Sequence, residues 1–207
     1  MNNFLLYKNK VLTFSKLIGL SSIGTTVQLL TSLITGKIIA VFFGSAGLVM
    51  VGQLSNMITI GTNLTSLGSR FGFVKIASRD SSKIFRKEMY SVLSFYLLLV
   101  GYFFSIIFII FSKFLSSYYL LDEKYMSIVF LLALTLPLVN LFTLLNSVLN
   151  GFQNFTKQVK INIVASILKF SPLLLVFFIE TDTYLLLLLI IIGNVFVGSY
   201  ALIYGIV

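Results

Sequence analysis

Six long apolar segments constrain this chain more than any other feature of its sequence. A helix needs about 20 apolar residues to cross the hydrocarbon core of a lipid bilayer, and each segment is long enough to do so. The segments span residues 17–43, 46–68, 89–112, 125–151, 159–179 and 184–204. The sequence therefore predicts an all-α fold, a polytopic bundle of six transmembrane helices within a single unit, residues 1–207.

Composition supports a membrane location and excludes several kinds of site. Hydrophobic residues make up 58% of the chain and charged residues 10%, whereas an ordinary soluble domain has about 25% charged residues. The chain contains no cysteine and no histidine, so it lacks thiol chemistry and the commonest general base and metal ligand. We find no P-loop, metal-ligand cluster or intramembrane carboxylate pair, and we expect neither enzyme activity nor a cofactor.

The distribution of the net charge of +9 predicts the orientation of the chain. Cytoplasmic loops of membrane proteins are enriched in lysine and arginine. With the N-terminus in the cytoplasm, the inner segments hold 11 of the 15 basic residues: Lys8, Lys10, Lys16, Arg70, Lys75, Arg79, Lys83, Arg86, Lys87, Lys157 and Lys160. The outer loops then hold four of the six acidic residues: Asp122, Glu123, Glu180 and Asp182. We therefore predict a cytoplasmic N-terminus, and no nucleic-acid partner for the basic residues.

Two segments allow more than one interpretation. The first apolar segment follows basic residues, as in a signal peptide, but it is too long and lacks an A-x-A-like cleavage site, which favours an uncleaved anchor. The loop 69–90 mixes basic and apolar residues. This mixture is typical of an amphipathic helix lying on the inner leaflet among anionic lipid headgroups. A regulatory or partner-binding role for the loop is the alternative.

Two lysines lie at membrane depth. Lys37 is near the end of the first segment, where its side chain either reaches the interface or faces a cavity. Lys169 is about ten residues from both ends of the fifth segment, and a lysine at the centre of a span costs about 2.5–3.5 kcal/mol on insertion. The spans offer neither lysine a carboxylate. We therefore predict that this pair faces a water-filled cavity or an anionic substrate.

Polar residues also recur along the apolar segments. In the second segment they are spaced by three or four residues, which places them on one helical face: Gln53, Asn56, Thr59, Asn63 and Ser66. The fourth segment carries a weaker version of this polar pattern: Asn140, Asn146 and Asn150. Interhelical hydrogen bonding explains such residues, and so does the lining of a cavity for a sugar-bearing ligand.

Other features of the spans bear on packing rather than chemistry. The stretch GTTVQLLTSLITG (24–36) contains small residues that suit close helix packing. Pro137 and Pro172 are the only prolines and both lie within spans, where each predicts a kink.

Three short stretches resemble the polysaccharide exporters that include the O-antigen flippases. GKIIAVFFGSAGLVMVGQL (36–54) is similar to the end of that family's first helix and the turn into its second. GSRFGFVKIAS (68–78) resembles the exit of the second helix, and LNGFQNFTKQVKINI (149–163) the loop between the fourth and fifth helices. Each motif is short, but the motifs occur in the family's order, and the resemblance they indicate extends over most of the chain. Lys37 matches the family's motif lysine, and Lys75 matches a lysine at the cytoplasmic rim.

The resemblance implies a transporter of the bacterial inner membrane that flips undecaprenyl-diphosphate-linked oligosaccharide from the inner to the outer leaflet. It implies two six-helix lobes around a cationic cavity, so we expect this chain to be one lobe, either part of a longer protein or the partner of a second half or a homodimer mate. The expected substrate-binding residues are Lys37, Lys169, Gln53, Asn56, Asn63, Lys75 and Arg70. Lys169 has no counterpart in the motifs and rests on the physical argument alone.

Other functions fit parts of the same pattern. A multidrug exporter of the same superfamily would be expected to carry an intramembrane carboxylate, which these spans lack. A membrane scaffold or inactive fragment would place both lysines at headgroups or loops, with no polar cavity between its helices. A membrane enzyme of glycan synthesis is disfavoured by the absence of histidine and the scarcity of carboxylates.

Overall fold

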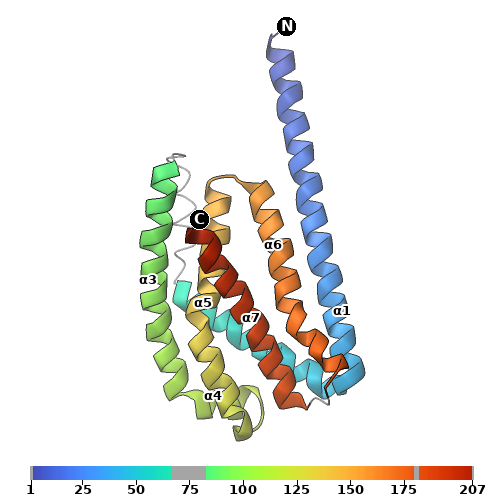
Figure 1. Cartoon of the computed structure of the whole chain (residues 1–207), viewed down its shortest axis with the longest axis vertical. Coiled ribbons are helices and arrows are strands. Elements are labelled where there is room, and N and C mark those ends of the chain that lie inside the picture. Colours follow the sequence, from blue (N-terminus) through green and yellow to red (C-terminus); the bar gives the residue numbers. More distant parts are fainter. Residues whose placement is uncertain (1, 67–82, 180–181, 207) are drawn as a thin grey trace.

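The computed structural model describes residues 2–66, 83–179 and 182–206, and this part of the chain is helical with no strand (Figure 1). The elements in chain order are α1 (Asn2–Ser66), α3 (Lys83–Ile110), α4 (Ser112–Tyr119), η1 (Glu123–Tyr125), α5 (Met126–Gly151), α6 (Phe155–Phe170), η2 (Ser171–Phe177) and α7 (Thr183–Ile206). The predicted all-α class is confirmed. Most of the loop 69–90 lies outside the described residues, and its last part begins α3.

Five helical stretches are long and apolar enough to cross a membrane, which indicates a multi-pass membrane protein. They are Ser21–Ser66, Ser91–Ile110, Glu123–Gly151, Phe155–Phe177 and Thr183–Tyr204. The first has 46 residues, a length of about 69 Å at 1.5 Å per residue, more than twice the thickness of the hydrocarbon core. It is interrupted at Gly44, between the two segments predicted at 17–43 and 46–68.

Gly44 breaks α1 into two halves. Its backbone angles, φ 63° and ψ −158°, lie in a region that only glycine adopts without strain. Figure 1 shows the first half running down one side of the bundle beside α6 and the second half turning back across it toward α3 and α5. The two halves of α1 therefore enclose the end of α6 and η2 between them.

Helix α5 is the centre of the bundle and packs against α3, α7 and the second half of α1 (Figure 1). Its residues Ile128, Leu132 and Leu136 are completely buried, together with Leu54 of α1 and Leu187 of α7. By contrast, the first half of α1 exposes a series of large aliphatic side chains: Ile23, Leu29, Leu30, Leu33, Ile34 and Val41. An apolar outer surface of this kind needs no polar covering in lipid.

The proline in α5 is accommodated by a neighbouring serine. Pro137 has no N–H, so the carbonyl of Ala133 loses its helical hydrogen bond. The hydroxyl of Ser105 in α3 donates to that carbonyl at 2.6 Å. Gly101, one turn earlier, brings α3 so close that a Cβ there would lie 3.1 Å from the Cα of Pro137. The predicted proline site is thus a point of contact between two helices.

The second proline changes the type of helix. The fifth predicted span, 159–179, is α6 up to Phe170 and continues as the 3₁₀ helix η2 from Ser171. Pro172 leaves the carbonyl of Leu168 without its helical donor, and the hydroxyl of Ser171 donates to it at 3.0 Å. Lys169 therefore sits in the last turn of α6, directly before this change.

Candidate functional site: an open cleft containing Lys169

A cleft of about 460 Å³ lies between the two halves of α1, α6, η2 and α7. This volume is within the range of about 300–1,000 Å³ typical of small-molecule sites. Polar lining residues are Gln28, Thr31, Ser32, Thr35, Ser55, Ser166 and Lys169. Apolar lining residues are Ile39, Leu48, Val51, Phe170, Leu173, Leu189 and Ile190. The cleft therefore combines a hydroxyl-rich wall with an apolar wall.

Glycines help to keep the cleft open. Gly36 and Gly52 complete the lining, one from each half of α1, and a Cβ at either position would meet no atom within 4 Å. The break at Gly44 lies between them, so the angle there sets the distance between the two walls formed by α1.

Among the described residues that line the cleft, Lys169 is the only charged one. Its side chain is exposed, as expected for a group that faces an opening rather than packed neighbours. The ion pairs among the described residues join Lys113 to Glu123 and Lys124 to Asp122, and Lys169 takes part in neither. Its ammonium is therefore available to an anionic ligand.

The position of Lys169 depends on close packing between α6 and α7. Gly193 of α7 lies against the backbone of Lys169, and a Cβ at Gly193 would clash with the Lys169 carbonyl oxygen. Because the obstacle is backbone, no side-chain rotation could relieve the clash. The absence of a side chain at Gly193 thus allows α7 to support the last turn of α6.

Several hydroxyls of the polar wall donate their protons to the helix backbone. Thr31 bonds the carbonyl of Val27 at 2.8 Å, Thr35 that of Thr31 at 2.8 Å, and Ser166 that of Asn162 at 2.8 Å. A hydroxyl whose proton is used in this way still has oxygen lone pairs to offer a ligand donor. The cleft can therefore accept hydrogen bonds from ligand hydroxyls along this wall and donate from Lys169 and Gln28.

The predicted site residues do not all meet in this cleft. Lys169 lines it, whereas Lys37 is exposed and is not part of the lining. Gln53 is half-buried and Asn56 and Asn63 are exposed, and these three also lie outside the lining. Arg70 and Lys75 lie outside the described residues. Substrate binding by these seven residues remains a prediction.

Interhelical hydrogen bonding, the alternative explanation for the polar residues of the spans, is observed between Asn140 and Thr65. The Asn140 amide of α5 donates to the hydroxyl of Thr65 in α1, and both side chains are buried. Within the described ranges 2–66, 83–179 and 182–206, the side-chain oxygens of Asn140 and Asn146 have no hydrogen-bond partner. Thr65 belongs to the same half of α1 as the predicted polar stripe, so this half uses polar groups for helix packing.

Sequence reasoning missed the polar wall contributed by the first half of α1. The stretch 24–36 was expected to serve close packing, and Gly24 does so, since a Cβ there would lie 2.8 Å from the Val159 side chain. The same stretch also supplies four polar cleft residues: Gln28, Thr31, Ser32 and Thr35. Their spacing of three and four residues was the available signal, because it places them on one helical face.

No group of three or more metal-ligating residues occurs in the part of the chain that the structure describes. Comparison with protein-family models, curated proteins and solved structures gives no match. The candidate site is therefore interpreted from its own geometry and from the short motifs in the sequence.

Proposed function

We propose that this chain is a lobe of a membrane transporter that flips undecaprenyl-diphosphate-linked oligosaccharide from the inner to the outer leaflet. The observation that carries the proposal is Lys169, a cation with no carboxylate partner among the residues that the structure describes, in an open, hydroxyl-lined cleft inside an apolar bundle. The resemblance of residues 36–54, 68–78 and 149–163 to the polysaccharide exporters supports it.

The two walls of the cleft suit the chemistry of such a substrate. At a separation of 4 Å and an effective dielectric constant of 20, a lysine gains about 4 kcal/mol from an anion before desolvation is subtracted. The diphosphate would bind Lys169, the sugar hydroxyls would donate to Thr31 and Thr35, and the isoprenoid chain would lie along Phe170 and Leu173. The volume is sufficient for the headgroup and its neighbouring atoms rather than a whole lipid-linked oligosaccharide.

The proposal includes six membrane crossings, with Gly44 at the turn between the first two and the N-terminus in the cytoplasm. It places the protein in the bacterial inner membrane. A second lobe, or a second copy of this chain, would complete the enclosure of the cleft, because alternating access in such transporters is a movement of one helical repeat against another. The angle at Gly44 would set how widely the cleft opens.

Binding of a short-chain polyprenyl-diphosphate sugar to the purified chain in nanodiscs tests the proposal. Lys169→Gln removes a charged contact worth about 1.5–3 kcal/mol, so we expect Kd to rise about tenfold to a hundredfold. Lys113→Gln, at an exposed lysine of α4, should leave Kd unchanged. Circular dichroism and gel filtration would establish that both variants are folded. Equal affinity of the wild type and Lys169→Gln would contradict the proposal, as would failure of the wild type to bind at millimolar ligand.

A further inference from the structure

The short helix α4 carries an exposed apolar ridge that the proposed transport site does not use. The ridge consists of Phe111, Phe114, Tyr118 and Leu121, whose exposed fractions are 54%, 62%, 67% and 77%. Phe114 and Tyr118 lie one turn apart on the same face of α4, and Phe111 and Leu121 flank the helix at its two ends. On the other side, Ser112, Ser116 and Leu120 are buried. Helix α4 is thus attached to the bundle by one face and presents aromatic rings on the other.

The ridge continues an apolar stripe that begins on α3. The members of the stripe on α3 are exposed and apolar: Val92, Phe95, Leu99, Phe103, Ile106 and Ile110. The span Ser91–Ile110 has 20 residues, or about 30 Å, which equals the thickness of the hydrocarbon core. The ridge therefore begins where α3 leaves the hydrocarbon.

The helix axis is interrupted at the same level. Phe111, with φ −90° and ψ 9°, separates α3 from α4, and Figure 1 shows α4 at the end of the bundle where α3 ends. The rings of Phe114 and Tyr118 stack with centroids 5.9 Å apart. Aromatic side chains are enriched at this depth, where an apolar ring meets the headgroups.

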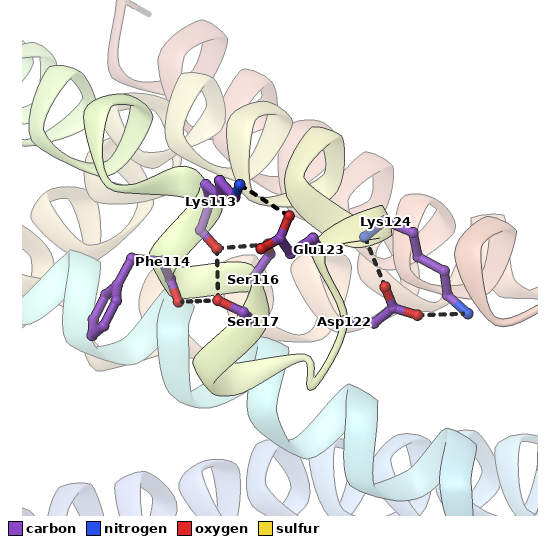
Figure 2. Close-up of polar contacts among 7 residues, drawn as sticks. All are labelled: Lys113, Phe114, Ser116, Ser117, Asp122, Glu123 and Lys124. Atoms are coloured by element: carbon purple, nitrogen blue, oxygen red, sulfur yellow. Dashed lines mark hydrogen bonds and ion pairs between the residues drawn. The ribbon is translucent and has the colours of Figure 1, made fainter.

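The charged groups beside the ridge neutralise one another. Residues 112–124 contain two lysines and two acidic residues, and each lysine is 3.2 Å from a carboxylate, in the pairs Lys113–Glu123 and Lys124–Asp122. Figure 2 shows the Phe114 ring and the Lys113–Glu123 pair on different sides of α4. Asp122 accepts hydrogen bonds from Lys124, first from its backbone amide and second from its ammonium group. These two bonds hold the pKa of the Asp122 carboxyl below its usual range. The segment offers lipids an apolar face and no net charge.

Leu121 gives the ridge an unusual end. It has a positive φ of 59°, a conformation after a helix that normally belongs to glycine. It nevertheless carries a large apolar side chain that is 77% exposed. Water would not compensate for such an exposed side chain, whereas the acyl boundary of a bilayer would.

We propose that α4 is an interfacial helix whose ridge of Phe111, Phe114, Tyr118 and Leu121 inserts into the headgroup–acyl boundary of the leaflet where α3 ends. The partner of this surface is lipid, because the ridge is continuous with the lipid-facing stripe of α3. Insertion depends on apolar contact rather than on anionic headgroups. The helix fixes the depth of the connection between α3 and α5, and this role does not depend on what the cleft transports.

The natural chain has no cysteine, so single-cysteine variants of the full chain can be spin-labelled without background. We would label Phe114→Cys, Tyr118→Cys and the control Ser117→Cys, an exposed neighbour outside the ridge. In phosphatidylcholine vesicles, we expect the ratio of oxygen to nickel-chelate accessibility to be at least about threefold higher at the two ridge positions than at Ser117. The ratio should not change when a quarter of the lipid is replaced by phosphatidylglycerol.

Three outcomes would overturn the proposal. High nickel-chelate accessibility at the ridge would mean that it lies in water. Low accessibility to both reagents, with dipolar broadening between labels, would mean that a second copy of the chain covers it. A ratio that rises only with anionic lipid would mean electrostatic attachment.

The chain also lacks tryptophan, so Phe114→Trp, with quenching by lipids brominated near the headgroup, gives an independent measure of depth.

Discussion

Substitution of Gly193 by alanine tests the close packing of α7 against α6 beside the cleft. A Cβ at this position would clash with the backbone of Lys169, so Gly193→Ala should push α6 and α7 apart. Overpacking of this kind costs about 1–3 kcal/mol. We expect the free energy of unfolding in SDS-containing micelles to fall by that amount.

The matched control for Gly193→Ala is Gly52→Ala. Gly52 also lies in a helix next to the cleft, but a Cβ there meets no atom within 4 Å. Alanine is a better helix former than glycine, so this variant should be as stable as the natural chain or slightly more stable. Equal stabilities of Gly193→Ala and Gly52→Ala would show that α7 does not press on Lys169 as described.

The contact between α3 and α5 is an element-scale feature that a double-mutant cycle can measure. The Ser105 hydroxyl donates to the Ala133 carbonyl, which Pro137 leaves without a helical donor. Ser105→Ala should therefore lower the free energy of unfolding by about 0.5–2 kcal/mol, the range for hydrogen bonds between membrane helices. In a Pro137→Ala background, the N–H of residue 137 can replace the lost donor, and the same substitution should cost less.

The coupling between the two substitutions decides this interpretation. We expect at least about 0.5 kcal/mol of interaction energy, since the two side chains act on one carbonyl. The cycle cancels changes in the packing of Gly101 against Pro137, because both Pro137→Ala variants contain them. A coupling of zero would mean that Ser105 is important only for its own helix, through its second bond to the Gly101 carbonyl at 2.9 Å.

At the scale of the whole molecule, the apolar segments could be predicted from sequence because hydropathy depends on composition over about 20 residues. The polar face of the cleft could not, because it depends on how each helix is rotated. Leu54 and Met57 are buried in the core, and this packing turns Gly52 and Ser55, rather than Gln53, toward the cleft. The position of Lys169 beside a cavity could be predicted because its depth within the fifth segment alone made it exceptional, whereas Lys37, predicted to face the same cavity, is not part of the lining.

At this scale, the number of times that α1 crosses the membrane has a direct test. If residues 21–66 cross twice, with the turn at Gly44, then four crossings separate Ser15 from Thr156 and both lie on the same side of the membrane. If they cross once, three crossings separate them and they lie on opposite sides. Single cysteines at Ser15, Ser117 and Thr156, all exposed, can be labelled with an impermeant maleimide in intact cells and in inverted vesicles.

The three positions give different patterns for the two topologies. We expect Ser15→Cys and Thr156→Cys to react only in inverted vesicles and Ser117→Cys only in intact cells. This pattern requires residues 21–66, about 69 Å of helix, to be folded back within the membrane, as expected from a glycine break in a helical stretch more than twice as long as the hydrocarbon core is thick. Labelling of Ser15→Cys together with Ser117→Cys, and opposite to Thr156→Cys, would show a single crossing. The two halves of α1 could then not form opposing walls of a cleft at membrane depth, and the transport proposal would lose the geometry on which it rests.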